Sequence, residues 1–257
     1  MIEIRMLKKA ELNGYTFIEG FPGIGLVGPM SIGYMIDKLK MEYCGYIHSD
    51  DFPPLISIHN SKPMPPVRLY YSQKNRIVAV FAEFAIPIEL NYDMSERLID
   101  FVKSNGIAKI ISIVGVPIKS LGLGIDAKNA ETEKSDKVYG IASTESQVKA
   151  IEKAGMVGVT EGVATGVSAL LLERAVIENI DDLAILVSVD QGMIDPKYAE
   201  LAVNKIDALL DLNIDTAELE KEARLVEAKV KELLKKNKET HDDYKNAVEA
   251  AGPSMYA

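Results

Sequence analysis

The chain has 257 residues, of which 47% are hydrophobic and 26% charged, so it is able to bury the large core of a globular protein. Its formal net charge of -9 disfavours nucleic acid or an anionic membrane surface as a partner, because both attract clustered Lys and Arg. No apolar run reaches the ~18 residues of a membrane span, and residues 1–5 lack the pattern of a signal peptide. The single cysteine cannot form an internal disulfide. We therefore expect a cytoplasmic protein.

Short apolar runs rich in β-branched and aromatic residues predict a series of strands. In chain order they are Tyr15–Glu19, Tyr43–His48, Leu55–His59, Val67–Tyr71, Arg76–Ala82, Lys109–Val114, Lys137–Ala142, Val157–Val159 and Leu183–Val189. Residues 110–114 and 183–187 are almost continuously apolar, which is typical of strands buried on both faces of a mostly parallel sheet.

Helical patterns occupy the intervals between these strands. The predicted helices are Pro29–Leu39, Met94–Ser104, Glu145–Ala154, Thr165–Glu178 and Lys197–Leu210. Strands that alternate with helices indicate βαβ units with helices on both faces of the sheet. We therefore predict an α/β fold, a three-layer αβα domain with a mostly parallel central sheet that spans residues 1–212.

Two proline-rich stretches flank the predicted strand Leu55–His59. Pro53-Pro54 precedes it, and Pro63-Met64-Pro65-Pro66 follows it. Prolines in such places usually fix a loop or protect a sheet edge, and they less often form a ligand for an SH3-type domain. We expect a hairpin connection here.

The composition becomes more charged after Leu212. A helix start at Asp215 is followed by apolar residues at spacings of 4, 3, 4 and 3, namely Leu219, Ala223, Val226, Val230 and Leu233. This stripe would pack either on its own domain or on another subunit, and the sequence leaves both open.

The remaining residues suggest a division of the chain into three parts. Gly252-Pro253 would stop a helix, because proline lacks the amide donor and restricts the residue before it. We expect a core domain over 1–212, a charged C-terminal helix over 213–250, and a flexible tail over 251–257.

A glycine-rich loop follows the first predicted strand. Gly23, Gly25 and Gly28 form a literal G-x-G-x-x-G between a strand and a helix, which is the layout of a dinucleotide-binding fold. Pro29 argues against a phosphate site, because it cannot donate and places the helix after the glycines. We favour a tight, closely packed turn, and we keep a nucleotide- or nucleoside-binding enzyme as the alternative.

The other chemical patterns are weak. His48, His59 and His241 lack the spacing of a zinc site, and Cys44 lies within a predicted strand, as a small core residue would. The carboxylate pairs Glu83/Glu89 and Asp190/Asp195 are too common to indicate acid–base catalysis, and no P-loop is present. We therefore expect no catalysis, no metal and no cofactor.

The glycine loop also carries a family resemblance. Gly20, Phe21, Pro22, Gly23, Gly25 and Gly28 resemble the signature of the proteasome assembly chaperone family, on its archaeal side. Asp51–Pro54, Ile111–Gly115 and Gly166–Leu171 follow in the order that the family has. The resemblance implies a nucleoside-phosphorylase-like fold without a preserved active site, in trimers or tetramers that bind proteasome α subunits. Some relatives bear the label of ATP-grasp enzymes.

The last three residues match a second motif of proteasome-binding proteins. Met255, Tyr256 and Ala257 fit the pattern hydrophobic-Tyr-X (HbYX), by which activators and assembly factors dock between proteasome α subunits. A basic group would capture the free carboxylate, and the Tyr ring would add a rigid apolar contact. We expect a homo-oligomeric chaperone or adaptor that presents several such tails to the α-ring of the core particle.

Overall fold

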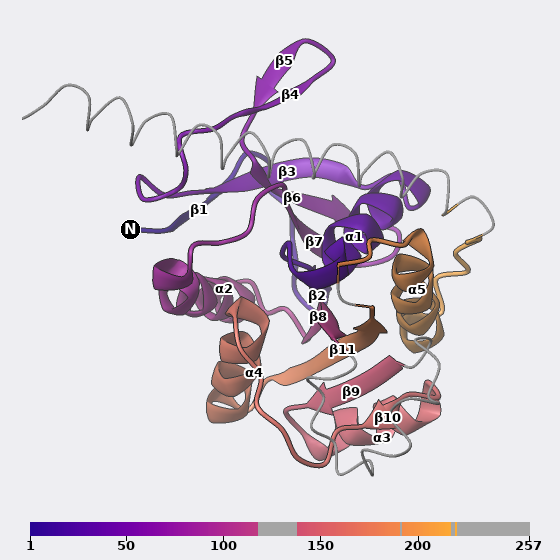
Figure 1. The fold of residues 1–257 in the computed structure, drawn as a ribbon. Coiled ribbons are helices and arrows are strands. Elements are labelled where there is room, and N and C mark those ends of the chain that lie inside the picture. Colours follow the sequence, from indigo (N-terminus) through magenta and orange to yellow (C-terminus); the bar gives the residue numbers. More distant parts are fainter. Residues whose placement is uncertain (118–137, 191, 217–218, 220–257) are drawn as a thin grey trace, which may run out of the picture.

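The computed structural model describes residues 1–117, 138–190, 192–216 and 219. Within these residues, nine strands form one sheet (Figure 1). Their spatial order is β1 (Glu3–Met6), β3 (Glu42–His48), β6 (Val67–Ser72), β7 (Ile77–Ala82), β2 (Thr16–Glu19), β8 (Lys109–Pro117), β11 (Asp181–Val189), β9 (Val138–Ala142) and β10 (Val157–Gly158).

The middle of the sheet is parallel and its margins are mixed. Strand β2 pairs in parallel with β7 on one side and with β8 on the other, and β8 pairs in parallel with β11. Antiparallel pairs join β7 to β6, β6 to β3, β3 to β1 and β11 to β9. The predicted α/β fold is confirmed, and parallel pairing joins the four central strands and, at one margin, β9 to β10.

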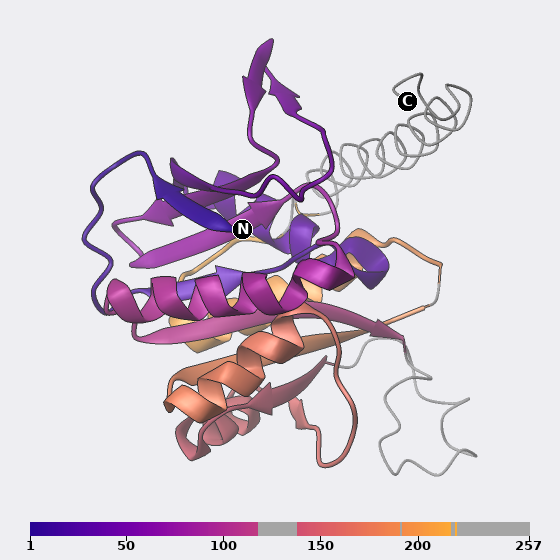
Figure 2. The same ribbon diagram turned by 90° about the vertical axis from the view of Figure 1, so that its left-hand side faces the viewer.

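Helices cover both faces of this sheet. On one face lie α1 (Val27–Lys38), α3 (Glu145–Lys153) and α5 (Pro196–Leu210), which bury a first core with Met30, Ile151 and Val203. On the other face, α2 (Asn91–Ser104) and α4 (Val167–Glu178) bury a second core with Leu98 and Leu171 (Figure 2). Both cores lie against strands with apolar side chains on each face, as the sequence predicted.

The five predicted helices and the nine predicted strands of the body are all present, with ends that differ by a few residues. The prediction that the first helix begins after the glycines is wrong, because α1 begins at Val27 and includes Gly28. Pro29 lies in its first turn, where the missing amide is tolerated. Two strands were not predicted, β1 and β5 (Lys62–Met64). Each is short, and their polar or proline-containing sequences carry little strand signal. No helix among the described residues has the length and apolar composition needed to cross a bilayer.

The segment that follows Leu212 begins by packing on the body. Leu212 and Ile214 contact the first core, and Leu219 is buried there. The rest of the predicted helix over 213–250, and the tail over 251–257, lie outside the described residues. The domain boundary at residue 212 therefore stays a prediction.

A two-stranded hairpin projects from the sheet between β3 and β6. Strands β4 (Ser57–His59) and β5 pair antiparallel around a turn at Asn60 and Ser61, both with positive φ, and the hairpin stands clear of the body (Figures 1 and 2). Its outer side exposes Ile58, at 71%. A lone hairpin is marginally stable in water, so this arm needs an anchor.

A buried ion pair supplies that anchor. The Arg68 guanidinium on β6 lies 2.8 Å from the carboxylate of Glu83, which follows β7, and both side chains are almost fully buried. The Ser57 hydroxyl donates to Glu83 Oε2, and His59 Nε2 lies 3.1 Å from Oε1. Arg68 also donates to the carbonyl oxygen of Pro65, at 2.8 Å. Glu83 therefore connects the arm to the sheet.

We expect Glu83→Ala to destabilise the protein by about 3–5 kcal/mol, because it leaves the buried Arg68 charge without its partner. Denaturant unfolding measures this loss. Glu89→Ala is the matched control, since Glu89 is exposed on the 3-10 turn η2 (Ile88–Leu90) and should change stability little. Equal stability of the two variants would contradict the anchoring role.

Candidate functional site

The glycine loop joins the carboxyl end of β2 to helix α1. After Glu19 the chain passes through residues 20–23 into the 3-10 turn η1 (Ile24–Leu26), whose Leu26 amide donates to the Gly23 carbonyl at 3.1 Å. Gly25 has φ +70° and Leu26 has φ +51°, so two successive residues are left-handed. Such a reversal favours glycine, and it turns the chain directly into the helix.

Gly20, Gly25 and Gly28 of this loop are enclosed by protein atoms. A Cβ on Gly28 would lie 2.6 Å from the carbonyl oxygen of Gly20, and one on Gly25 would lie 3.1 Å from the Val189 side chain. On β8, a Cβ on Gly115 would lie 2.0 Å from the Ile24 carbonyl oxygen. The absence of side chains lets the loop pack against the ends of β8 and β11, which explains these glycines without a ligand.

The remaining signature residues divide between core and surface. Pro22 is buried, and Phe21 is half-buried against the second core. Gly23 is exposed, with the nearest atom to a Cβ there 3.9 Å away, and Ile24 is 44% exposed. The loop thus presents only its tip to solvent.

Two carboxyl groups are buried on the sheet face beneath α4. Glu19 and Asp182 have no exposed surface, and one oxygen of Glu19 and both of Asp182 have no hydrogen-bond partner among the described residues. Burial raises the pKa of Glu19, an effect that the nearby Ser168 and Ser112 hydroxyls, and the Phe21 amide that donates to Glu19 Oε2 at 3.3 Å, partly oppose. Burial raises the pKa of Asp182 well above its usual value, and the nearby Glu19 adds to that rise.

These carboxyls do not form a catalytic pair in this structure. Neither Glu19 nor Asp182 reaches solvent, so neither is placed to exchange a proton with a bound molecule. Within the described part of the chain, no cluster of His, Cys, Asp or Glu is arranged to hold a metal ion. The groups are best understood as core polar residues that reduce stability.

The other residues considered from the sequence have structural roles. Cys44 is buried in β3, its thiol donates to the Leu69 carbonyl at 3.4 Å, and burial raises its pKa to about 12. Its predicted place in the core is confirmed. Asp195 caps α5 by accepting from the Lys197 amide, and Asp190 accepts from the Tyr198 hydroxyl.

The structure also brings polar residues into contacts that the sequence did not predict. Arg68, Ser57 and His59 converge on Glu83, and Asp182 lies near Glu19. The signal in the sequence was the charged residue Arg68 within the predicted strand Val67–Tyr71. The partners come from distant segments, so the sequence could not identify them.

The predicted docking residues Met255, Tyr256 and Ala257 lie outside the described residues. Of the sequence-predicted sites, only the glycine loop is placed by the structure.

A family model described as the PAC2 family matches residues 17–234. The uncharacterized protein MJ0106 of Methanocaldococcus jannaschii is 29% identical over 230 residues, which is 89% of each chain. Pyrococcus furiosus PbaA, described as an archaeal homolog of proteasome-assembly chaperone, is 27% identical, with a TM-score of 0.77 over 93% of this chain and 100% of PbaA. PbaB, an archaeal proteasome activator from the same organism, shares the fold at 20% identity, with a TM-score of 0.71 over 90% of this chain and 98% of PbaB.

We expect Gly28→Ala to destabilise the protein by about 1–3 kcal/mol, because the added methyl group would overlap the Gly20 backbone. Alanine is otherwise favoured over glycine inside a helix, so a loss can be assigned to this contact. Gly23→Ala is the matched control, because it has room and an extended backbone. Thermal and denaturant unfolding compare the two, and a fully stable Gly28→Ala variant would refute the close packing.

We expect Asp182→Asn to change how stability depends on pH. The pKa of Asp182 is raised in the folded state. Its contribution to stability is therefore complete below its pKa in the unfolded chain, about 3.9, and is lost as the pH rises toward its pKa in the folded protein. Relative to the wild type, the free energy of unfolding of the asparagine variant should rise by up to about 1.4 kcal/mol per pH unit above pH ~4. Denaturant unfolding across pH measures the difference, with the exposed Glu152→Gln as control. A pH-independent difference would contradict the prediction.

Proposed function

The chain belongs to the PAC2 family, and from that membership we propose that it is a non-catalytic proteasome assembly chaperone or adaptor. Its partner is the α-ring of the proteasome core particle, and its setting is the cytoplasm. The fold shared with PbaA over nearly the whole of both chains supports this proposal. The observation that carries it is the match of almost the entire body to a protein described as a homolog of an assembly chaperone.

The packing of the glycine loop supports a non-catalytic role. Gly20, Gly25 and Gly28 lie against backbone or side-chain atoms of the protein itself, so their presence needs no phosphate. The buried Glu19 and Asp182 are closed off from solvent. The nucleotide-binding alternative therefore has no structural observation in its favour among the described residues.

The proposed docking element is Met255-Tyr256-Ala257. Its support is the sequence, in which an apolar residue and a tyrosine precede Ala257. Docking requires that Ala257 carry a free carboxylate, which a basic group on the α-ring would bind while the Tyr ring fills an apolar site. The contact area of one tail is small, so its affinity alone should be weak, in the range of about micromolar to millimolar.

Self-association would make such weak tails effective. We propose a homo-oligomer, a trimer or a tetramer, that presents several tails at once. Linked binding events raise the overall affinity by about 10²–10⁴ when the spacing fits.

We expect deletion of residues 255–257, or Tyr256→Ala, to abolish capture of purified proteasome α subunits in a pulldown. Ser254→Ala is the matched control and should bind like the wild type. Addition of one glycine after Ala257 should also abolish capture, because it displaces the carboxylate from its pocket. Light scattering of each variant checks that the oligomer is unchanged.

Undiminished capture after the deletion would refute docking by the tail while leaving the chaperone role intact. Failure of the wild-type protein to bind α subunits or core particles would refute the proposed function as a whole.

A further inference from the structure

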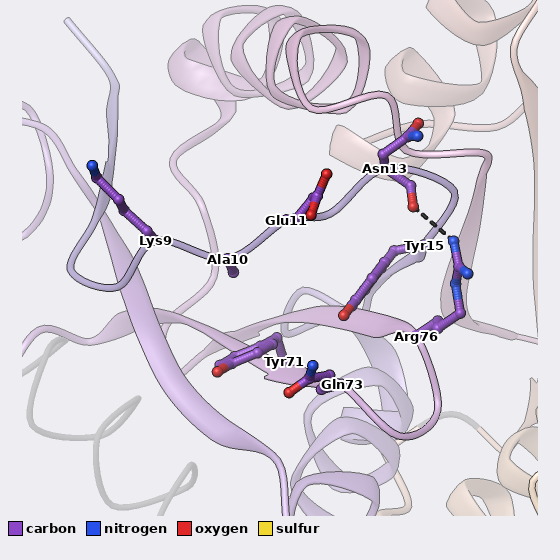
Figure 3. A pocket seen from close by; sticks show the side chains of 8 residues that line it. All are labelled: Lys9, Ala10, Glu11, Asn13, Tyr15, Tyr71, Gln73 and Arg76. Atoms are coloured by element: carbon purple, nitrogen blue, oxygen red, sulfur yellow. Dashed lines mark hydrogen bonds between the residues drawn. The ribbon is translucent and has the colours of Figure 1, made fainter.

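A cavity of about 500 Å³ lies at the amino ends of the parallel strands, on the edge of the sheet opposite the glycine loop. Figure 3 shows its lining residues, which come from the loop before β2, from the end of β6 and from the turn before β7. The residues used below are Lys9, Asn13, Tyr15, Tyr71, Gln73 and Arg76. The cavity is therefore bordered by three separate segments.

A second cavity, of about 860 Å³, meets the first at Tyr71 and Gln73. Its walls include Lys40 in the turn between α1 and β3, and Lys74 in the turn between β6 and β7. The two cavities thus flank the β6–β7 turn. We call the combined region the amino-edge surface, defined by Lys9, Lys40, Tyr71, Gln73, Lys74 and Arg76.

The first cavity has an aromatic floor with a fixed cation beside it. The Tyr15 ring is buried, and the Arg76 guanidinium lies 5.6 Å from its centre. Arg76 Nη2 also donates to the Asn13 carbonyl at 2.8 Å, which Figure 3 marks with a dashed line. An arginine offers several donors in a planar fork, so the remaining ones stay available to a carboxylate.

The amino-edge surface carries positive charge that is not neutralised within the described chain. Lys9, Lys40, Lys74 and Arg76 are exposed, and no salt bridge among the described residues joins any of them to a carboxylate.

Acidic groups on the same walls do not cancel this charge. Glu42 is already paired with Lys8 at 2.7 Å, and the second cavity is lined by Lys38 as well as by Asp215, so their formal charges add to zero. Glu11 is the remaining acidic residue of the first cavity. On a chain with a net charge of -9, this local excess of cations stands out.

We propose that the amino-edge surface binds an acidic segment of a partner protein in an extended conformation. The cations match carboxylate side chains, and the amides of Asn13, Gln73 and Asn75 are able to donate to and accept from a peptide main chain. A tyrosine wall adds apolar contact. Nucleic acid fits less well, because a net charge of -9 repels a polyanion that must meet many cations.

This surface is a second interaction site, separate in sequence from the proposed docking tail. It is formed by the folded body and faces the amino edge of the sheet. A variant that lacks residues 255–257 should therefore bind an acidic peptide like the full chain, which makes the two proposals separable.

The test is fluorescence anisotropy of the full-length protein with a labelled peptide of alternating glutamate and glycine, about eight residues long, which extends to roughly 26 Å. The double variant Lys40→Glu/Lys74→Glu should weaken binding by at least about tenfold. The matched control is Lys149→Glu/Lys153→Glu on α3, which makes the same change in net charge on exposed residues elsewhere and should leave binding unchanged.

Several outcomes would overturn the proposal. They are the absence of saturable peptide binding, equal weakening in the two double variants, displacement of the peptide by a single-stranded oligonucleotide that binds more tightly, and full displacement by millimolar inorganic phosphate. Saturable binding that only the Lys40→Glu/Lys74→Glu variant loses, and that neither competitor displaces, would support it.

Discussion

Burial of the four central parallel strands on both faces is the constraint on which the rest of the structure depends. Strand β2 shows it most clearly, because Phe17, Ile18 and Glu19 have no exposed surface. Helices must cover each face, so a polar side chain in these strands loses water and has to find partners within the protein. Glu19 and Asp182 have few hydrogen-bond partners, and burial therefore raises the pKa of each carboxyl group.

The same constraint confines interaction surfaces to the edges of the sheet and to appended segments. At the carboxyl edge, the tight turn of the glycine loop exposes little more than Gly23 and Ile24. At the amino edge, loops and turns leave two adjoining cavities with cationic rims. The β4–β5 arm is connected to the sheet through Ser57 and His59, which contact Glu83, and Glu83 is held in turn by its buried ion pair with Arg68. A covered sheet therefore acts as a rigid support for surfaces at its margins.

The same glycine pattern occurs for two different physical reasons, approach to a ligand and close packing of the protein itself. In dinucleotide-binding proteins, glycines allow the backbone to approach a pyrophosphate. Here, Gly20 and Gly28 let two backbone segments touch, and Gly25 leaves room for Val189. The motif therefore identifies a close approach without saying what approaches. The chain shares its fold with PbaA and PbaB, and a shared fold does not by itself fix function, which depends on the sites that each protein carries on it.

The sequence by itself determined the α/β class, the central strands and the five helices, because burial and helical periodicity leave a local pattern in the residues. It also indicated a core position for Cys44 and a closely packed turn at the glycine loop. Short strands such as β1 and β5 escaped prediction, since polar and proline-containing sequences resemble loops. Only the tertiary structure decided that Arg68 meets Glu83 and that Arg76 and Lys74 border adjoining cavities. Such contacts join residues from separate segments, and no local pattern encodes which distant segment will be the neighbour.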